Sequence, residues 1–112
     1  YTRINYPNVY EEVPVMPQFP EGQQALMQFL AKKIQYPTIA QGDMCMGRVI
    51  IQFIIDKEGN IIKPRVARGI DPYLDKEALR VINQMPKWKP GELEDGTKVA
   101  VYFTVPVMFR AQ

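Results

Sequence analysis

The stretch from Thr97 to Phe109 alternates between apolar and other side chains with the two-residue period of a β-strand. The stretch from Arg48 to Ile55 is also typical of a strand, but its side chains are largely apolar and β-branched on both faces. A strand with two apolar faces indicates a central position in a sheet, because both faces need cover. These two runs predict a chain built around a β-sheet.

A third strand is predicted from Ile61 to Arg68. It is joined to Arg48–Ile55 by the short turn Asp56–Asn60, in which Gly59 can adopt a positive φ angle. Two strands separated by a loop of this length form a hairpin. We therefore expect these two strands to be antiparallel neighbours.

The prolines predict the order of the three strands. A proline cannot donate a hydrogen bond to a ladder, so it belongs on an edge strand or at a bulge. Pro64 and Pro106 lie in two of the strands, and Arg48–Ile55 has no proline. The expected order places Arg48–Ile55 between Ile61–Arg68 and Thr97–Phe109, with both neighbours antiparallel to it.

Two helices are predicted outside the strands. The first runs from Gln23 to Gln35 and ends at Tyr36-Pro37, because proline disfavours the helical conformation of the residue before it. The second has Asp71 as its N-cap and Pro72 in its first turn, and it ends at Pro86. Their apolar residues recur at helical spacing, namely Leu26, Phe29, Leu30 and Ile34, and then Leu74, Ala78, Val81, Ile82 and Met85. The elements together predict an α+β fold, a three-stranded antiparallel sheet with two helices on one face.

The N-terminal part is expected to differ from the rest. Residues 1–22 are predicted to form an extended, proline-rich segment with a short strand near Val9–Val13, followed by a folded domain at residues 23–112. The sequence leaves open whether the segment folds onto the domain or covers a sheet edge. The chain begins at Tyr1 without a signal peptide or a membrane-spanning run, so we expect any anchor to lie upstream.

The composition argues against catalysis. There is no histidine, which removes the usual general base and the commonest metal ligand, and the glycines form no phosphate-binding loop. Met44-Cys45-Met46 offers soft sulfur atoms and Trp88 lies between lysines, but ordinary packing explains both better than a metal or nucleic-acid site. With a net charge of +2, we expect no enzyme activity, no cofactor, no metal and no nucleic-acid partner.

Several motifs occur in an order and spacing that together resemble the TonB C-terminal domain family. They are Tyr36-Pro37 after a helix, the run Gly47–Asp56 followed by Gly59, Val66–Ile70 leading to Leu74–Ala78, Met85–Gly91, and the final Val105–Phe109. The resemblance covers Tyr36 to Phe109. The run Met16–Gly22 also resembles an extension carried by TonB homologues of some Gram-negative lineages, where a second glycine is common in place of Glu21.

The resemblance implies a function. In this family a helix in the inner membrane precedes a proline-rich periplasmic spacer and then this domain. The domain grips the TonB box, a short peptide of an outer-membrane transporter, and transmits proton-motive force from an inner-membrane motor complex to drive uptake of siderophores or other nutrients. The chain would then be the periplasmic domain of a protein anchored in the inner membrane.

The expected binding site is the outer edge of the last strand, where a peptide could be added as a further strand. Its predicted pairing residues are Val101, Tyr102, Phe103, Thr104 and Val105, flanked by Val99 and Val107. The resemblance adds Lys33, Ile34, Gln35, Tyr36 and Pro37, although Ile34 also suits a core position and Tyr36-Pro37 a helix stop packed on the sheet. The ladder should falter at Pro106, which lacks a donor.

Other interpretations stay open at this point. The strand edge could be covered by the N-terminal segment or by a second copy of the chain. The domain could belong to a membrane sensor peptidase, which a metal-binding motif upstream would reveal. It could also be a dimerising assembly module, which sedimentation at several concentrations would detect.

Overall fold

The computed structural model describes residues 8–35 and 47–109, in which there are two helices and five strands. These elements are β1 (Val9–Tyr10), α1 (Gln23–Lys33), β2 (Gly47–Ile55), β3 (Ile61–Arg68), α3 (Pro72–Ile82), β4 (Gly91–Glu92) and β5 (Lys98–Phe109). No helix in the described part is long and apolar enough to cross a membrane. Two sequence predictions, on Tyr36-Pro37 and on Met44–Met46, lie outside the described residues.

The three long strands form the centre of the sheet. β2 lies between β3 and β5 and is antiparallel to both, which confirms the order predicted from the prolines. The pairing of β2 with β5 is unbroken from Gly47↔Phe109 to Ile55↔Val101. The pairing of β2 with β3 shifts register twice, and Lys63 in β3 has a positive φ of 53°. Pro64 therefore lies in an irregular edge strand, where its missing donor costs least.

The sheet is larger than the three-stranded antiparallel sheet that the sequence predicts. β1 pairs with β5 in parallel, through Val9↔Ala100 and Tyr10↔Val101. β4 pairs with β5 antiparallel, through Gly91↔Val99. β1 lies within the short strand predicted near Val9–Val13, although its pairing with β5 was not predicted. β4 has only two residues, which is too short for an alternation of side chains to reveal it. The prediction of an all-antiparallel, three-stranded sheet was wrong in these two respects.

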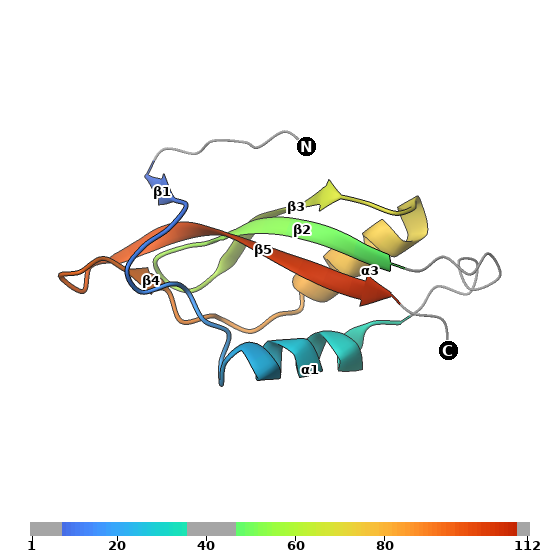
Figure 1. The fold of residues 1–112 in the computed structure, drawn as a ribbon, viewed down its shortest axis with the longest axis horizontal. Coiled ribbons are helices and arrows are strands. Elements are labelled where there is room, and N and C mark those ends of the chain that lie inside the picture. The colour runs from blue at the N-terminus through green and yellow to red at the C-terminus, as the bar shows by residue number, and fades with distance from the viewer. Residues whose placement is uncertain (1–7, 36–46, 110–112) are drawn as a thin grey trace.

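Both helices pack on the same face of the sheet, as predicted, because their buried residues belong to one core cluster with β2 and β5. Figure 1 shows α1 below the strands, whereas α3 overlaps them in this view. The core between them joins residues of both helices to the alternate residues of β2 and β5. Its fully buried side chains include Leu26, Val49, Ile51, Phe53, Leu74, Val81, Ile82, Val105, Val107 and Phe109. The helices end earlier than predicted, α1 at Lys33 and α3 at Ile82. The predicted N-cap Asp71 is confirmed, because its side chain accepts from the backbone N–H groups of Tyr73 and Leu74.

The described part of the N-terminal segment folds onto the domain. Its backbone forms two antiparallel bridges with the chain before β5, Val15↔Glu92 and Gln18↔Lys89. Phe19 is buried, and its ring meets the ring of Trp88 edge-on with the centroids 5.6 Å apart. The segment thus contributes a side chain to the core and lies beside the N-terminal end of β5 (Figure 1).

Candidate functional site

The sheet has two open edges among the described residues, the outer edge of β5 beyond β1 and the outer edge of β3, which is irregular and contains Pro64. On one side β5 pairs with β2 from Val101 to Phe109. On the other side β1 covers Ala100 and Val101, and no strand of the described residues continues beyond that point. An open edge of this kind presents unpaired backbone N–H and C=O groups to a partner.

The hairpin between β2 and β3 shows which backbone groups of β5 point to the open edge. The N–H of Asp56 donates to the carbonyl of Asn60 at 3.0 Å, so Asp56 faces β3 and its neighbour Ile55 faces β5. Backbone direction alternates along antiparallel strands, so Ile55 and its partner Val101 face each other. The same alternation makes Phe103, Val105 and Val107 face β2. It directs the backbone groups of Tyr102, Thr104, Pro106 and Met108 outward.

Pro106 agrees with this assignment. A proline facing β2 would remove a hydrogen bond from the central ladder, whereas at an outward position its missing N–H costs the fold nothing. The open edge therefore offers outward N–H donors at Thr104 and Met108. Between them, Pro106 offers only its carbonyl oxygen, because proline has no backbone N–H. A strand added here would meet a gap in its ladder at Pro106.

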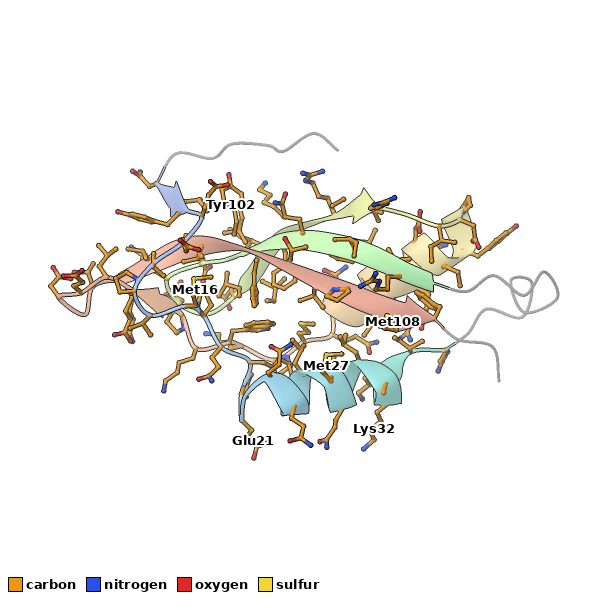
Figure 2. All side chains as sticks on the ribbon, viewed as in Figure 1. Met16, Glu21, Met27, Lys32, Tyr102 and Met108 are labelled. Carbon is orange, nitrogen blue, oxygen red and sulfur yellow. The ribbon has the colours of Figure 1, made fainter. Side chains whose placement is uncertain are left out.

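The predicted site residues of β5 divide into two groups. The side chains of Val101, Val105 and Val107 are buried in the core, and their backbone groups face β2, so they have little to offer a partner directly. Val99 is half-buried and pairs with Gly91 of β4. Figure 2 shows Tyr102 near the end of β5 that β1 covers, and Met108 near the opposite end.

Thr104 combines an exposed side chain with outward backbone groups, and Phe103 is half-buried on the helix side of the sheet. Met108 was not among the predicted site residues, because residue type does not show the direction of a backbone N–H. Pro106 was the one available sequence signal for this direction. Because a proline suits a position that faces away from β2, it suggests that the even-numbered residues around it also face outward.

The predicted segment after α1 is held by two residues of α3. The backbone N–H of Gln35 donates to Glu77 Oε2 at 2.7 Å, and Arg80 Nη2 donates to the carbonyl oxygen of Lys33 at 3.0 Å. Arg80 and Glu77 also bond to each other, with Nε to Oε1 at 2.6 Å. The side chains of Lys33 and Gln35 are exposed, while Ile34 packs against the core. We call these contacts of Glu77 and Arg80 the clamp. The clamp fixes the direction in which the chain leaves α1, and it therefore positions the predicted site residues Lys33 and Gln35.

The clamp depends on an ionised Glu77. Partial burial acts to raise the pKa of Glu77, but the hydrogen bonds from Arg80 and from the Gln35 backbone, with the charge of Arg80, outweigh it and lower the pKa below 4.5. A lowered carboxyl pKa means that the stabilisation is complete above the ordinary pKa of glutamate. It is lost as the pH falls through the lowered pKa of the folded state.

Replacing Glu77 with glutamine is therefore expected to loosen the segment at neutral pH. The neutral amide keeps one acceptor oxygen but loses the charge and the two-point bond to Arg80. The protection factor of the Gln35 amide, which corrects the exchange rate for its intrinsic dependence on pH, should fall several-fold relative to the unchanged protein, and acidification should reproduce this fall. Glu94→Gln, at an exposed loop residue, serves as the control and should leave this factor unchanged. Equal Gln35 exchange in both variants would show that the clamp does not hold the segment.

The described residues contain no group of three histidine, cysteine, aspartate or glutamate side chains that could hold a metal ion. Cys45 lies outside the described residues.

Comparisons with known proteins agree with this fold. The family model of the Gram-negative bacterial TonB protein C-terminal matches residues 32–111. A solution NMR structure of the Helicobacter pylori TonB C-terminal domain is similar with a TM-score of 0.60 and 22% identity, over 80% of this chain and 79% of that one. A shorter fragment of the same domain has a TM-score of 0.57 and 22% identity, over 77% and 89%. No curated protein matches the chain in sequence. At this identity, the solved structures establish the likeness of the fold alone.

Proposed function

Because this chain belongs to the TonB C-terminal domain family, as the sequence resemblance indicated, we propose that it is the periplasmic partner-binding domain of a TonB-type energy transducer. Domains of this family are not enzymes. In the proposed function, the domain holds the TonB box of an outer-membrane transporter and couples it to a proton-driven motor complex of the inner membrane. The anchor and the contact with the motor would belong to a part of the protein upstream of these residues.

The open outer edge of β5 is the observation that supports this proposal. A peptide can add to such an edge as a further strand, so that main-chain bonds supply affinity and neighbouring side chains supply choice. Thr104 and Met108 would donate to the peptide, and the carbonyl groups of Thr104, Pro106 and Met108 would accept from it. The clamped segment Lys33–Gln35 directly precedes the proposed site residues Tyr36 and Pro37 in the sequence.

The proposed backbone hydrogen bonds between β5 and the peptide suit an interaction that must be reversible. Each backbone hydrogen bond contributes only about 1 kcal/mol net, so a short ladder with a gap at Pro106 is reversible at rest. A strand pulled along its own axis nevertheless loads its hydrogen bonds together. The proposed edge can therefore transmit a pull and still let the transporter go.

Replacing Thr104 with proline is expected to weaken binding of a TonB-box peptide at least roughly tenfold, because it removes an outward donor and blocks close approach of the added strand. Thr104→Val is the matched control, since it changes the exposed side chain and keeps the N–H. Calorimetric titration would give the dissociation constant, and chemical shifts would locate the peptide on Thr104–Met108. Both variants should unfold at nearly the temperature of the unchanged protein, since the residue faces away from β2.

The competing assignment is a dimer through the same edge, in which a second copy of the chain replaces the peptide. Concentration-dependent sedimentation of the unchanged protein, abolished by Thr104→Pro, would favour that assembly module. Peptide binding that survives Thr104→Pro, or shifts that avoid β5, would contradict strand addition at this edge.

A further inference from the structure

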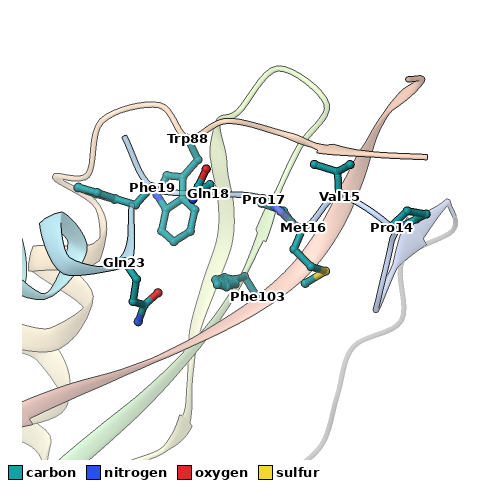
Figure 3. A pocket seen from close by; sticks show the side chains of 9 residues that line it. All are labelled: Pro14, Val15, Met16, Pro17, Gln18, Phe19, Gln23, Trp88 and Phe103. Carbon is teal, nitrogen blue, oxygen red and sulfur yellow. The ribbon is translucent and has the colours of Figure 1, made fainter. Parts of the chain in front are cut away.

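A pocket without charged lining residues lies where the covered part of the β5 edge ends (Figure 3). Its volume is about 440 Å³, and it is lined by residues 14–19 of the N-terminal segment, by Gln23 at the start of α1, by Trp88 and by Phe103. The chain leaves the edge of β5 after Tyr10 and forms one wall of the pocket from Pro14 onward. The pocket is therefore continuous with the open edge through Phe103.

The geometry of the edge points one side chain of an added strand toward this pocket. Residues directly opposite each other on neighbouring strands direct their side chains to the same face of the sheet. Phe103 faces the helices, so a peptide residue opposite it would also face the helices. Because the backbone of Phe103 bonds to β2, an antiparallel partner would form a non-hydrogen-bonded pair with it, the kind that brings side chains closest.

The lining of the pocket is suited to an uncharged side chain. None of the described residues that line it is charged, and the polar ones are Gln18 and Gln23. Met16 is 40% exposed in the lining, and Met27 is 41% exposed one turn after Gln23, whose Nε2 lies 4.0 Å from the sulfur of Met27. In Figure 2 both methionines lie on the helix side of β5. Methionine side chains adapt to the shape of an apolar partner, which explains their use on binding surfaces.

We propose that this pocket receives an aliphatic or aromatic side chain of the partner peptide, from the position opposite Phe103, and so selects among peptides that could all pair with β5. The inference rests on the proposed function, since it assumes an added strand. It assigns to the proline-rich N-terminal segment a role in recognition, because residues 14–19 form most of the pocket wall.

The single tryptophan of the chain gives a direct test, because Trp88 lines the pocket. The probe is a tryptophan-free TonB-box peptide, with each apolar residue changed in turn to aspartate. Tryptophan emission reports filling of the pocket, and the amide shifts of Thr104 and Met108 report pairing with β5. Met16→Glu places a charge in the pocket wall at an exposed position, and Tyr73→Glu, at a residue 51% exposed on α3, is its control.

We expect the unchanged peptide to shift the tryptophan emission, and one aspartate substitution to remove that shift while weakening binding roughly tenfold or more. Met16→Glu should weaken binding by a similar factor, and Tyr73→Glu should not. Pairing at Thr104 with equal affinity for both variants would overturn the pocket assignment and leave the proposed function intact. Absence of any pairing at β5 would overturn the proposed function together with this inference. If the tryptophan emission changes when the protein alone is concentrated, the pocket is filled by a second copy of the chain. That result would contradict the proposal that the pocket receives a peptide side chain.

Discussion

Replacing Trp88 with alanine is expected to lower the free energy of unfolding by about 3–5 kcal/mol, a large part of the stability of a domain of this size. Its ring is 3% exposed and meets three other aromatic rings, with centroid distances of 5.0 Å to Phe103, 5.6 Å to Phe19 and 5.7 Å to Phe53. These rings come from β5, the N-terminal segment and β2. The substitution should therefore loosen all three where they meet, and urea unfolding would measure the loss.

Trp88→Phe is the matched control. The indole N–H of Trp88 is buried and finds no acceptor among the described residues, so phenylalanine gives up no hydrogen bond while it keeps an aromatic ring. We expect a loss of about 1 kcal/mol for this variant. A loss as large as that of the alanine variant would show that the indole itself, rather than aromatic packing, holds the three segments together.

Replacing Gly59 with alanine is expected to cost roughly 2–5 kcal/mol, from overpacking together with a left-handed backbone. Gly59 has a φ of +89°, and a Cβ atom there would lie 2.1 Å from the carbonyl oxygen of Trp88. The loop at Trp88 cannot retreat freely, since the Trp88 N–H donates to the carbonyl of Gly59 at 2.8 Å. Thermal and urea unfolding of the purified variant would measure the effect.

Gly96 separates the two causes of that loss. Its φ of +86° is nearly the same, but a Cβ atom there would meet no atom within 4 Å. Gly96→Ala should therefore cost only the conformational part, about 1–2 kcal/mol. If both alanine variants lose the same stability, the close approach of Gly59 to Trp88 is not a rigid contact, and the steric argument fails.

The long elements could be predicted because their side chains repeat with a local period. The alternation in β5 indicated a strand, and the two apolar faces of β2 indicated a central strand. Pro64 and Pro106 then indicated the order of the three long strands. The capping residue Asp71 and the following proline placed the start of α3 correctly. Each of these signals lies within about a dozen residues, a distance over which backbone preference and burial act on the same short segment.

The candidate site was less predictable, because it depends on which backbone groups are left unpaired. The side-chain pattern predicted a continuous binding stretch in β5, but the structure directs alternate residues to β2 and leaves Thr104 and Met108 to donate outward. That division depends on the register of three strands, and residue type carries no direct record of register apart from prolines.

The sequence by itself determined the α+β class, the three long strands and their order, the hairpin between β2 and β3, and the resemblance to the TonB family. Only the tertiary structure decided that the N-terminal segment packs beside β4, that β1 ends after Tyr10 and leaves the edge open, and that Phe19, Trp88 and Phe103 enclose a pocket. The reason is physical. Periodic burial can be recognised from residues that are close together in the sequence. The contacts of the N-terminal segment instead join residues about 70 to 90 positions apart, and they depend on the whole chain having folded around one core.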